Sequence, residues 1–250
     1  MKKMLSIIAV LLVSVLVISI TACNTGNETE TTLPQTTQST PSTTGGSQDF
    51  YQVGISQLIQ HDALDAATQG FKDALTEKLG DQVSFDYQNA QGDPNTAASI
   101  ANGFVASKYD LIMANATPAL QAAATATADI PILGTSITEY GVALGIEDFQ
   151  GTVGGNVSGT SDLAPLDQQA EVIKDLFPDK ESVGLLYCSA EPNSLYQINT
   201  MQTLLEEMGY LCKAYPFTDS NDLAAITTTA VNEVDVIYVP TDNTVAANTA

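Results

Sequence analysis

Short apolar segments alternate with longer segments of helical periodicity from residue 50 to the end of this 250-residue chain. The alternation predicts βαβ units, in which each helix returns the chain so that successive strands run parallel. The expected fold class is therefore α/β with parallel sheets. Strands are expected at 51–56, 83–87, 110–114, 131–135, 142–146, 183–187, 210–215 and 235–239, and helices are expected to begin near residues 62, 93, 117, 165, 194, 221 and 241.

A glycine-rich stretch at 151–159 interrupts this pattern, which then starts again. Roughly 200 structured residues is near the size at which a single core divides. We therefore expect two Rossmann-like lobes, an N-terminal lobe at 50–150 and a second lobe at 151–250. Glycine also permits the backbone rotations of a hinge, which is expected at 147–160. A phosphate-binding loop is the poorer interpretation, because no Lys-Ser/Thr pair follows these glycines.

The last helical segment begins at Thr241 and reaches Ala250 without a cap. A parallel sheet without its closing strand and helix would leave an apolar face uncovered. We therefore expect the second lobe to be truncated and the fold to be C-terminally incomplete.

The first residues have the features of a secretory signal. Two lysines precede an apolar run at 6–20, which is shorter than the ~20 residues of a membrane-spanning helix. The sequence Ile20-Thr21-Ala22-Cys23 then resembles the lipobox of bacterial lipoproteins. Residues 1–22 are predicted to be a lipoprotein signal peptide, and Cys23 is predicted to be the acylated N-terminus. An uncleaved N-terminal anchor helix is the alternative.

Residues 23–49 are expected to be the lipidated cysteine and a disordered tether. Residues 24–48 contain nine Thr and three Ser, with Leu33 as their single large apolar side chain. Such a segment cannot bury enough apolar surface to offset the entropy lost on ordering. The protein is therefore expected to be lipid-anchored to the outer face of the bacterial cytoplasmic membrane.

The charge of the chain limits its ligands. It carries 29 Asp and Glu against 8 basic residues, all of them Lys, and has a formal net charge of −21. Binding to nucleic acid requires clustered Lys and Arg, so it is excluded. Without Arg there is no bidentate partner for a phosphate or a dicarboxylate. A neutral, zwitterionic or cationic ligand is favoured.

Polar residues collect where predicted strands end, which is where ligands bind in open α/β sheets. Thr117 and Ser194 begin predicted helices, whose free N–H groups can receive a carboxylate without Arg. Asp242 is expected to receive an ammonium group, with Glu191 and Asp162 behind it. The alternative for each of these residues is an ordinary role at a helix start.

Two cysteines follow Cys23 in the sequence. Cys188 is expected at the end of one parallel strand and Cys212 near the start of the next, too far apart for a disulfide. We expect two buried thiols. A disulfide is the alternative, because an exported protein meets an oxidising environment.

Five sequence blocks resemble, in order, those of the tryptophan/tyrosine-type ABC transporter substrate-binding lipoproteins. The blocks are 53–57 with His61, 115–118, 159–162, 187–194 and 238–244. The resemblance implies a periplasmic-binding-protein type I fold, whose two lobes close on a small ligand. It also implies that these loops face the cleft. The candidate ligand-binding residues are Gln57, His61, Asn115, Thr117, Ser161, Asp162, Tyr187, Asn193, Ser194, Asp242 and Asn243.

Two of these candidates have plainer interpretations. His61 precedes a predicted helix, and a surface position is favoured over a ligand contact. Tyr187 could stack on an aromatic ligand, although core packing is the usual role of a tyrosine in a strand.

The leading hypothesis is a solute-binding lipoprotein of an ABC importer that captures an amino acid, preferentially an aromatic one. Its partners would be the ligand, a permease subunit and the membrane through the lipid anchor. No cofactor and no metal are expected. An enzyme is not expected, because the chain has one His and no nucleophile motif. A sensory lipoprotein that docks on a receptor, a sugar-binding protein and a surface enzyme are the alternatives.

Overall fold

The computed structural model describes residues 50–249, which belong to one compact unit. The predicted signal peptide, Cys23 and the tether lie outside the described residues. None of the helices in the described part is both long and apolar enough to cross a membrane.

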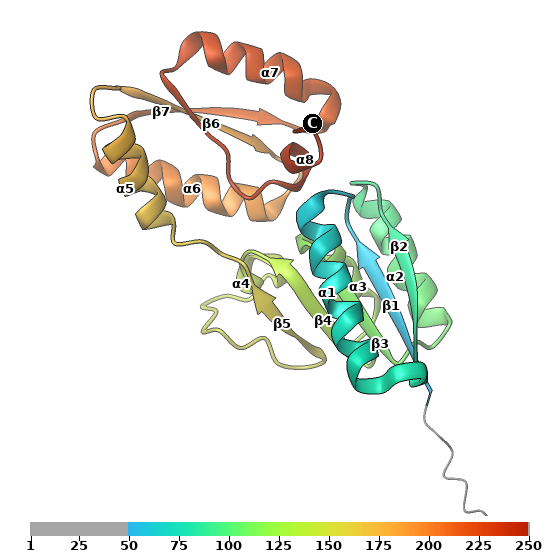
Figure 1. Ribbon diagram of the computed structural model, residues 1–250. Helices are drawn as coiled ribbons and strands as arrows, with labels where there is room; N and C mark the ends of the chain where they lie inside the picture. The colour runs from blue at the N-terminus through green and yellow to red at the C-terminus, as the bar shows by residue number, and fades with distance from the viewer. Residues whose placement is uncertain (1–49, 250) are drawn as a thin grey trace, which may run out of the picture. The chain divides into compact units, whose positions relative to one another are not determined.

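The first sheet has five parallel strands in the order β2-β1-β3-β4-β5. Helix α1 covers one face, whereas α2 and α3 cover the other (Figure 1). This division follows from the strand order, because the chain moves outward from β1 to β2 and then returns past β1 to β3. The strands are β1 (Tyr51–Gln57), β2 (Val83–Asn89), β3 (Leu111–Asn115), β4 (Ile132–Ile137) and β5 (Val157–Ser161), and the helices are α1 (Asp62–Leu79), the 3₁₀ turn η1 (Gly80–Gln82), α2 (Pro94–Ala106), α3 (Thr117–Ala126) and α4 (Tyr140–Leu144).

The second sheet has three parallel strands in the order β7-β6-β8. Helices α5 and α6 lie on one face and α7 lies on the other (Figure 1). The strands are β6 (Ser182–Cys188), β7 (Leu211–Phe217) and β8 (Val236–Tyr238), and the helices are α5 (Leu166–Leu176), α6 (Pro192–Glu207), α7 (Ser220–Glu233) and α8 (Asn243–Ala246).

Each sheet has its own hydrophobic core. In the first, Phe104 of α2 packs over β1, where a Cβ on Gly54 would lie 2.7 Å from the Phe104 ring. Glycine is therefore required there for close packing of helix on strand. In the second, Met201 and Leu205 of α6 pack with Leu185 of β6. Two separate cores agree with the predicted two-lobed organisation.

One predicted strand is wrong. Residues 142–146 were expected to extend the sheet, but Tyr140–Leu144 form α4. The Glu139 side chain caps this helix by accepting hydrogen bonds from the N–H groups of Gly141 and Val142, and Gly145 ends it in the left-handed conformation, with φ of 64°. These caps outweigh the apolar run. The other predicted strands are confirmed.

The strand that the sequence analysis missed is β5, which lies in the predicted glycine-rich crossover. It pairs with β4, so the first sheet continues to Ser161, beyond residue 150, where the sequence placed the end of the first lobe. Its five residues, VSGTS, are largely exposed and contain one large apolar side chain, so no apolar run marks them. The chain passes from the first sheet to the second at 162–165 instead of at the predicted hinge, 147–160.

Candidate functional site

Both sheets contain a point where the strand order reverses. In the first sheet β1 is flanked by β2 and β3, and in the second β6 is flanked by β7 and β8. Loops that leave neighbouring strands in opposite directions open a crevice at the carboxyl ends of those strands. The residues that follow β1, β3, β6 and β8 are therefore the natural candidates for a binding site.

Buried side chains tie α1 to the ends of β1 and β3. Gln57 accepts a 2.6 Å hydrogen bond from the Thr68 hydroxyl and donates one of 2.6 Å to Asp65. Asn115 donates to the Leu64 carbonyl at 2.8 Å and to Thr68 Oγ1 at 2.9 Å. These bonds satisfy polar groups that are completely buried. Gln57 and Asn115, both predicted ligand contacts, therefore hold the first lobe together.

The N-terminus of α3 is built differently. Ala116 precedes it with φ of 85°, and no side chain caps the helix. The Thr117 hydroxyl is buried and has no hydrogen-bond partner among the described residues, and the same is true of Asn115 Oδ1. The first turn contains no acidic residue. An uncapped helix start with an unpartnered buried donor favours an anionic group.

Glu191 organises the second lobe. The residue is 4% exposed and directly precedes α6. Oε1 accepts hydrogen bonds from the backbone N–H and the hydroxyl of Thr244 at 2.9 and 2.8 Å. Oε2 accepts from the backbone N–H of Asn243 at 3.0 Å and from the side-chain amides of Asn243 and Asn193 at 2.7 and 3.2 Å. This carboxylate therefore fixes the start of α8.

Asp242 is a second buried carboxylate in the same lobe. Oδ2 accepts hydrogen bonds from the backbone N–H of Cys188 at 2.7 Å and from the Ser194 hydroxyl at 2.8 Å, and Oδ1 accepts from the N–H of Val245 at 2.9 Å. Burial, and then the charge of Glu191, raise the pKa of Asp242 above its ordinary value. Asp242 thus joins three segments of the second lobe. It is also the N-cap residue of α8, and a role at a helix start is the alternative that the sequence left open.

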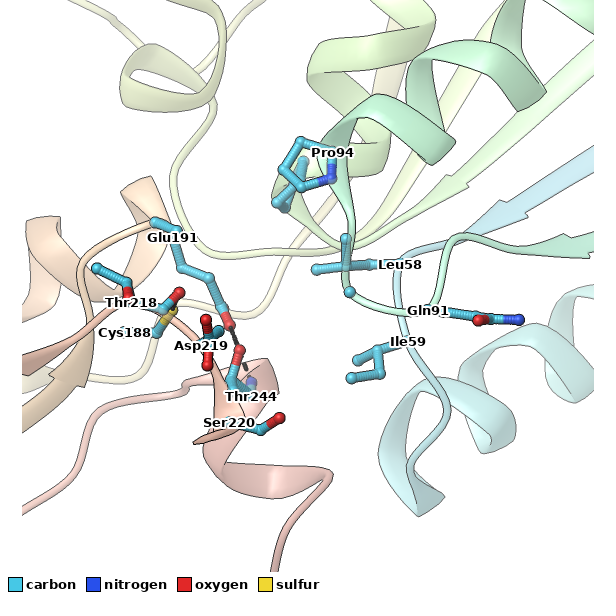
Figure 2. Close-up of a pocket in the computed structure, with 13 residues that line it drawn as sticks. Leu58, Ile59, Gln91, Pro94, Cys188, Glu191, Thr218, Asp219, Ser220 and Thr244 are labelled. Atoms are coloured by element: carbon cyan, nitrogen blue, oxygen red, sulfur yellow. Dashed lines mark hydrogen bonds between the residues drawn. The ribbon is translucent and has the colours of Figure 1, made fainter. Parts of the chain in front are cut away.

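A cavity of about 110 Å³ lies between the strand-end loops of the two sheets. Leu58 and Ile59 project from the side of β1, whereas Cys188, Glu191 and Asp219 project from the opposite side (Figure 2). Its walls combine apolar groups with acids and hydroxyls, and no Lys lines them. The complete lining is Leu58, Ile59, Gln91, Gly92, Pro94, Pro118, Cys188, Ala190, Glu191, Thr218, Asp219, Ser220 and Thr244.

The predicted loops contribute to this cavity, but the eleven predicted side chains do not line it. Their neighbours do, namely Leu58, Pro118, Cys188, Glu191 and Thr244. The loops after β2 and β7, which supply Gln91 and Asp219, were not selected from the sequence. Applying the strand-end rule to every strand, instead of only to loops rich in Asn and Thr, would have found them.

The remaining predicted residues lie in four places. Ser161 donates to the Thr138 carbonyl at 2.8 Å, and the backbone N–H of Asp162 donates to the Ile137 carbonyl at 3.0 Å, so both brace the chain where it leaves the first sheet. Tyr187 packs against the second core. Asn193 and Ser194 belong to the Glu191 and Asp242 clusters. Asn243 lies 3.4 Å from His61.

The two cysteines of the described chain are free thiols. Cys212 lies opposite Val183 in the pairing of β6 with β7, well before Cys188 along β6. Cys188 is buried as expected, whereas Cys212 is only half-buried. Burial raises the pKa of both thiols, that of Cys212 to about 11.

Within residues 50–249, no group of His, Cys, Asp and Glu side chains has the arrangement of a metal site. The cavity instead offers charge and hydrogen bonds to a small polar molecule with an apolar part. A two-lobed α/β protein with a ligand cavity between its strand ends is the class that the fold and this site define.

The sequence pattern of the family described as "ABC transporter substrate binding protein" matches residues 52–250. The chain belongs to this family. A curated relative, a tyrosine-binding protein from Clostridioides difficile, is 40% identical over 199 residues, which are 78% of this chain and 57% of that protein. The chain therefore spans little more than half the length of this relative.

Two solved structures share this fold at substantial identity. A domain from Streptococcus pneumoniae in complex with L-Trp has a TM-score of 0.75 at 36% identity, covering 80% of this chain and 68% of that one. A ligand-free, open substrate-binding protein with adhesive properties from Clostridium difficile has a TM-score of 0.55 at 39% identity, covering 79% and 68%. The arrangement described here thus scores higher against the L-Trp complex, although the open protein is slightly more similar in sequence.

A leucine-binding protein from Thermotoga maritima, 18% identical with a TM-score of 0.59 over 75% of this chain and 55% of that one, shares the fold alone. The periplasmic-binding-protein type I fold that the sequence predicted is confirmed. The relatives are substrate-binding proteins rather than enzymes, as predicted.

Proposed function

We propose that this protein is the extracytoplasmic solute-binding component of an ABC importer and that it captures an aromatic amino acid by closure of its two lobes. The tyrosine-binding relative and the L-Trp complex support the ligand class. The uncapped N-terminus of α3, with the unpartnered Thr117 hydroxyl, is the observation that carries the proposal.

An amino acid carries one negative and one positive group. One side of the cavity lies at the N-terminus of α3, and the other presents the carboxylates of Glu191 and Asp219. The α-carboxylate would bind at the start of α3, whose next residue, Pro118, lines the cavity. The ammonium group would face Glu191 and Asp219 across the cavity. The five donors around Glu191 use its lone pairs but leave its charge. The Asp219 carboxylate accepts one hydrogen bond, from the N–H of Asn221.

The position of the cavity supports binding by closure. Loops from both lobes line it, so a ligand held there contacts both sides. The ligand would then bridge them and stabilise the closed form by its greater affinity for that form.

We further propose that Cys23 carries a lipid that attaches the protein to the outer face of the cytoplasmic membrane. This proposal rests on the resemblance of residues 20–23 to a lipobox. Metabolic labelling with a fatty acid is expected to mark the wild-type protein and to fail with Cys23→Ala.

The ligand class is tested by calorimetric titration of the full chain with tyrosine, tryptophan, phenylalanine, leucine and glucose. Heat of binding and a rise in melting temperature are expected with at least one aromatic amino acid, because a ligand at 100 times its Kd stabilises by about 2.7 kcal/mol. The chain contains no Trp, so a change in the fluorescence of added tryptophan reports binding without a contribution from tryptophan in the protein. Binding of glucose alone would contradict the proposal.

A further inference from the structure

His61 occupies a position that its helix does not explain. It is the N-cap residue of α1, with φ of −160°, yet its side chain makes no capping hydrogen bond. Ser, Thr, Asp and Asn are preferred at this position because their short side chains reach the free N–H groups of the first turn. The imidazole instead lies within contact distance of a residue far away in the sequence.

The imidazole meets a residue of the other lobe. Nε2 of His61 lies 3.4 Å from Oδ1 of Asn243, across 182 positions of sequence. Asn243 is 8% exposed and begins α8. We call this pair the cross-lobe contact. It joins the start of the first helix of one lobe to the start of the last helix of the other.

Glu191 determines which atom of Asn243 faces His61. The Nδ2 group of Asn243 donates to Glu191 Oε2 at 2.7 Å, and the backbone N–H of Asn243 donates to the same oxygen at 3.0 Å. The carbonyl oxygen of the amide must therefore point outward. Because Oδ1 can only accept, His61 must donate from Nε2.

We propose that His61 is a positioning residue that stabilises the closed arrangement of the lobes through the cross-lobe contact. This inference rests on the proposed function, since it assigns to one side chain a part of the closure that retains the ligand. Glu191 lines the cavity and also orients Asn243. One carboxylate therefore serves both the proposed ligand site and the cross-lobe contact.

The similarity between structures agrees with this assignment. The cross-lobe contact occurs in an arrangement that is more similar to the L-Trp complex than to the ligand-free open protein. A hydrogen bond made only when the lobes are together acts on the ligand indirectly. It lowers the rate at which the closed form opens and so prolongs the bound state.

Replacement of His61 by Asn separates this role from helix stability. Asn is a favoured N-cap residue and would cap α1, but its side chain is too short to reach Asn243. The melting temperature of ligand-free His61→Asn is expected to equal or exceed that of the wild type. Its Kd for the aromatic ligand is expected to rise about three- to tenfold, mainly through faster dissociation.

A matched pair on the other side of the contact completes the design. Asn243→Ala removes the acceptor, and Asn248→Ala removes an exposed amide from the same segment, where it bonds only the Thr244 carbonyl. The double variant His61→Asn/Asn243→Ala is expected to bind no more weakly than Asn243→Ala alone, because both substitutions remove the same bond. Asn248→Ala is expected to bind as the wild type does.

A second measurement does not depend on ligand. His61 is the only histidine of the chain, so its imidazole resonances are unambiguous in NMR spectra. The proposal expects an imidazole that carries a proton on Nε2 in the wild type and shifted ring resonances in Asn243→Ala but not in Asn248→Ala. If the wild type binds no amino acid, the proposed ligand class fails, and these resonances still decide whether the contact exists.

Two results would overturn the inference. One is an imidazole spectrum that Asn243→Ala leaves unchanged. The other is wild-type affinity and dissociation rate in His61→Asn.

Discussion

The Ser194 hydroxyl donates a 2.8 Å hydrogen bond to Asp242 Oδ2, and the same oxygen accepts the backbone N–H of Cys188 at 2.7 Å. These bonds join the start of α6, the end of β6 and the start of α8. The carboxylate is buried, and within the described residues no Lys or His side chain donates a hydrogen bond to it. The loops on the second-lobe side of the cavity are therefore held by a carboxylate whose ionised form is disfavoured by burial.

The first prediction concerns the pH dependence of stability. The pKa of Asp242 is raised in the folded protein, chiefly by burial, so the folded state binds a proton more tightly than the unfolded state. Its contribution to stability is greatest below the unfolded pKa and is lost as the pH rises through the raised pKa. In urea titrations from mild acid to neutral pH, wild-type stability is expected to fall with pH more steeply than that of Asp242→Asn.

Ser194→Ala serves as the companion to that experiment. The Ser194 hydroxyl stabilises the ionised form of Asp242, so its loss is expected to raise the pKa further and to move the pH-dependent loss of stability upward. Identical slopes for the wild type and Asp242→Asn would contradict the assignment.

The second prediction separates binding from folding at the start of α3. The Thr117 hydroxyl is buried without a partner, and such a group costs about 1–3 kcal/mol of stability. Thr117→Val is therefore expected to stabilise the ligand-free protein by about 1 kcal/mol and to weaken ligand binding about tenfold, as measured by calorimetry.

Ser56→Ala is the matched control for Thr117→Val. Ser56 also carries a buried, unpartnered hydroxyl, but it lies within β1. It is expected to raise stability and leave affinity unchanged. If Thr117→Val bound ligand as tightly as the wild type, the carboxylate would not bind at α3.

The third prediction concerns the edge of the first sheet. The Tyr140 hydroxyl donates to the Gly134 carbonyl at 3.1 Å and lies 3.3 Å from the Thr160 carbonyl. Burial, and then the charge of Asp162, raise the pKa of Tyr140 to about 12. Tyr140→Phe is expected to cost about 1–2 kcal/mol in urea unfolding. It is also expected to remove one of the two tyrosines, Tyr140 and Tyr238, whose pKa burial raises to about 12, as measured by spectrophotometric titration.

Gly159 faces this hydroxyl. A Cβ there would lie 2.1 Å from both the Gly134 oxygen and the Tyr140 hydroxyl, and φ is 154°. Gly159→Ala is expected to cost more than about 3 kcal/mol. Gly155 also has a positive φ, of 61°, but a Cβ there would meet no atom within 4 Å, so Gly155→Ala is the matched control. It is expected to cost only about 1–2 kcal/mol, so equal losses would contradict the close approach.

The fourth prediction uses the two thiols as reporters. Cys188 lines the cavity, whereas Cys212 lies away from it on β7. Burial raises both pKa values, so alkylation at pH 8 is expected to be slow at both sites. Saturating aromatic amino acid is expected to slow the reaction of Cys188 severalfold and leave that of Cys212 unchanged, as measured by mass spectrometry of peptides. Equal protection of the two would argue against the cavity as the ligand site.

The sequence predicted the parts of the fold that apolar periodicity controls. The buried strands β3 and β6 consist mostly of apolar residues, and helices with an apolar face alternate with them along the chain. By contrast β5 is short, exposed and polar, and it is held by the Tyr140 hydroxyl and a glycine instead of by buried apolar side chains. Periodicity cannot detect such a strand.

The candidate site shows a similar division. The strand-end rule selected several of the loops that line the cavity, but it could not tell a ligand contact from a structural hydrogen bond. Asp242 and Asn115 resemble binding residues in sequence, yet their partners are within the fold. The Asp219 loop was overlooked because its single acid and serine also form an ordinary helix cap. These distinctions depend on which polar atoms meet across long sequence separations.

Few backbone torsion angles in the short connection at 162–165 are free to change. Its first residue is tied to the Ile137 carbonyl, the Leu163 N–H bonds to Ser161 Oγ, and the ring of Pro165 fixes φ near −68°. In this part of the chain, the torsion angles with most freedom to change are therefore those of Leu163 and Ala164. In the closure that we propose, rotation of one lobe against the other would be concentrated in these two residues.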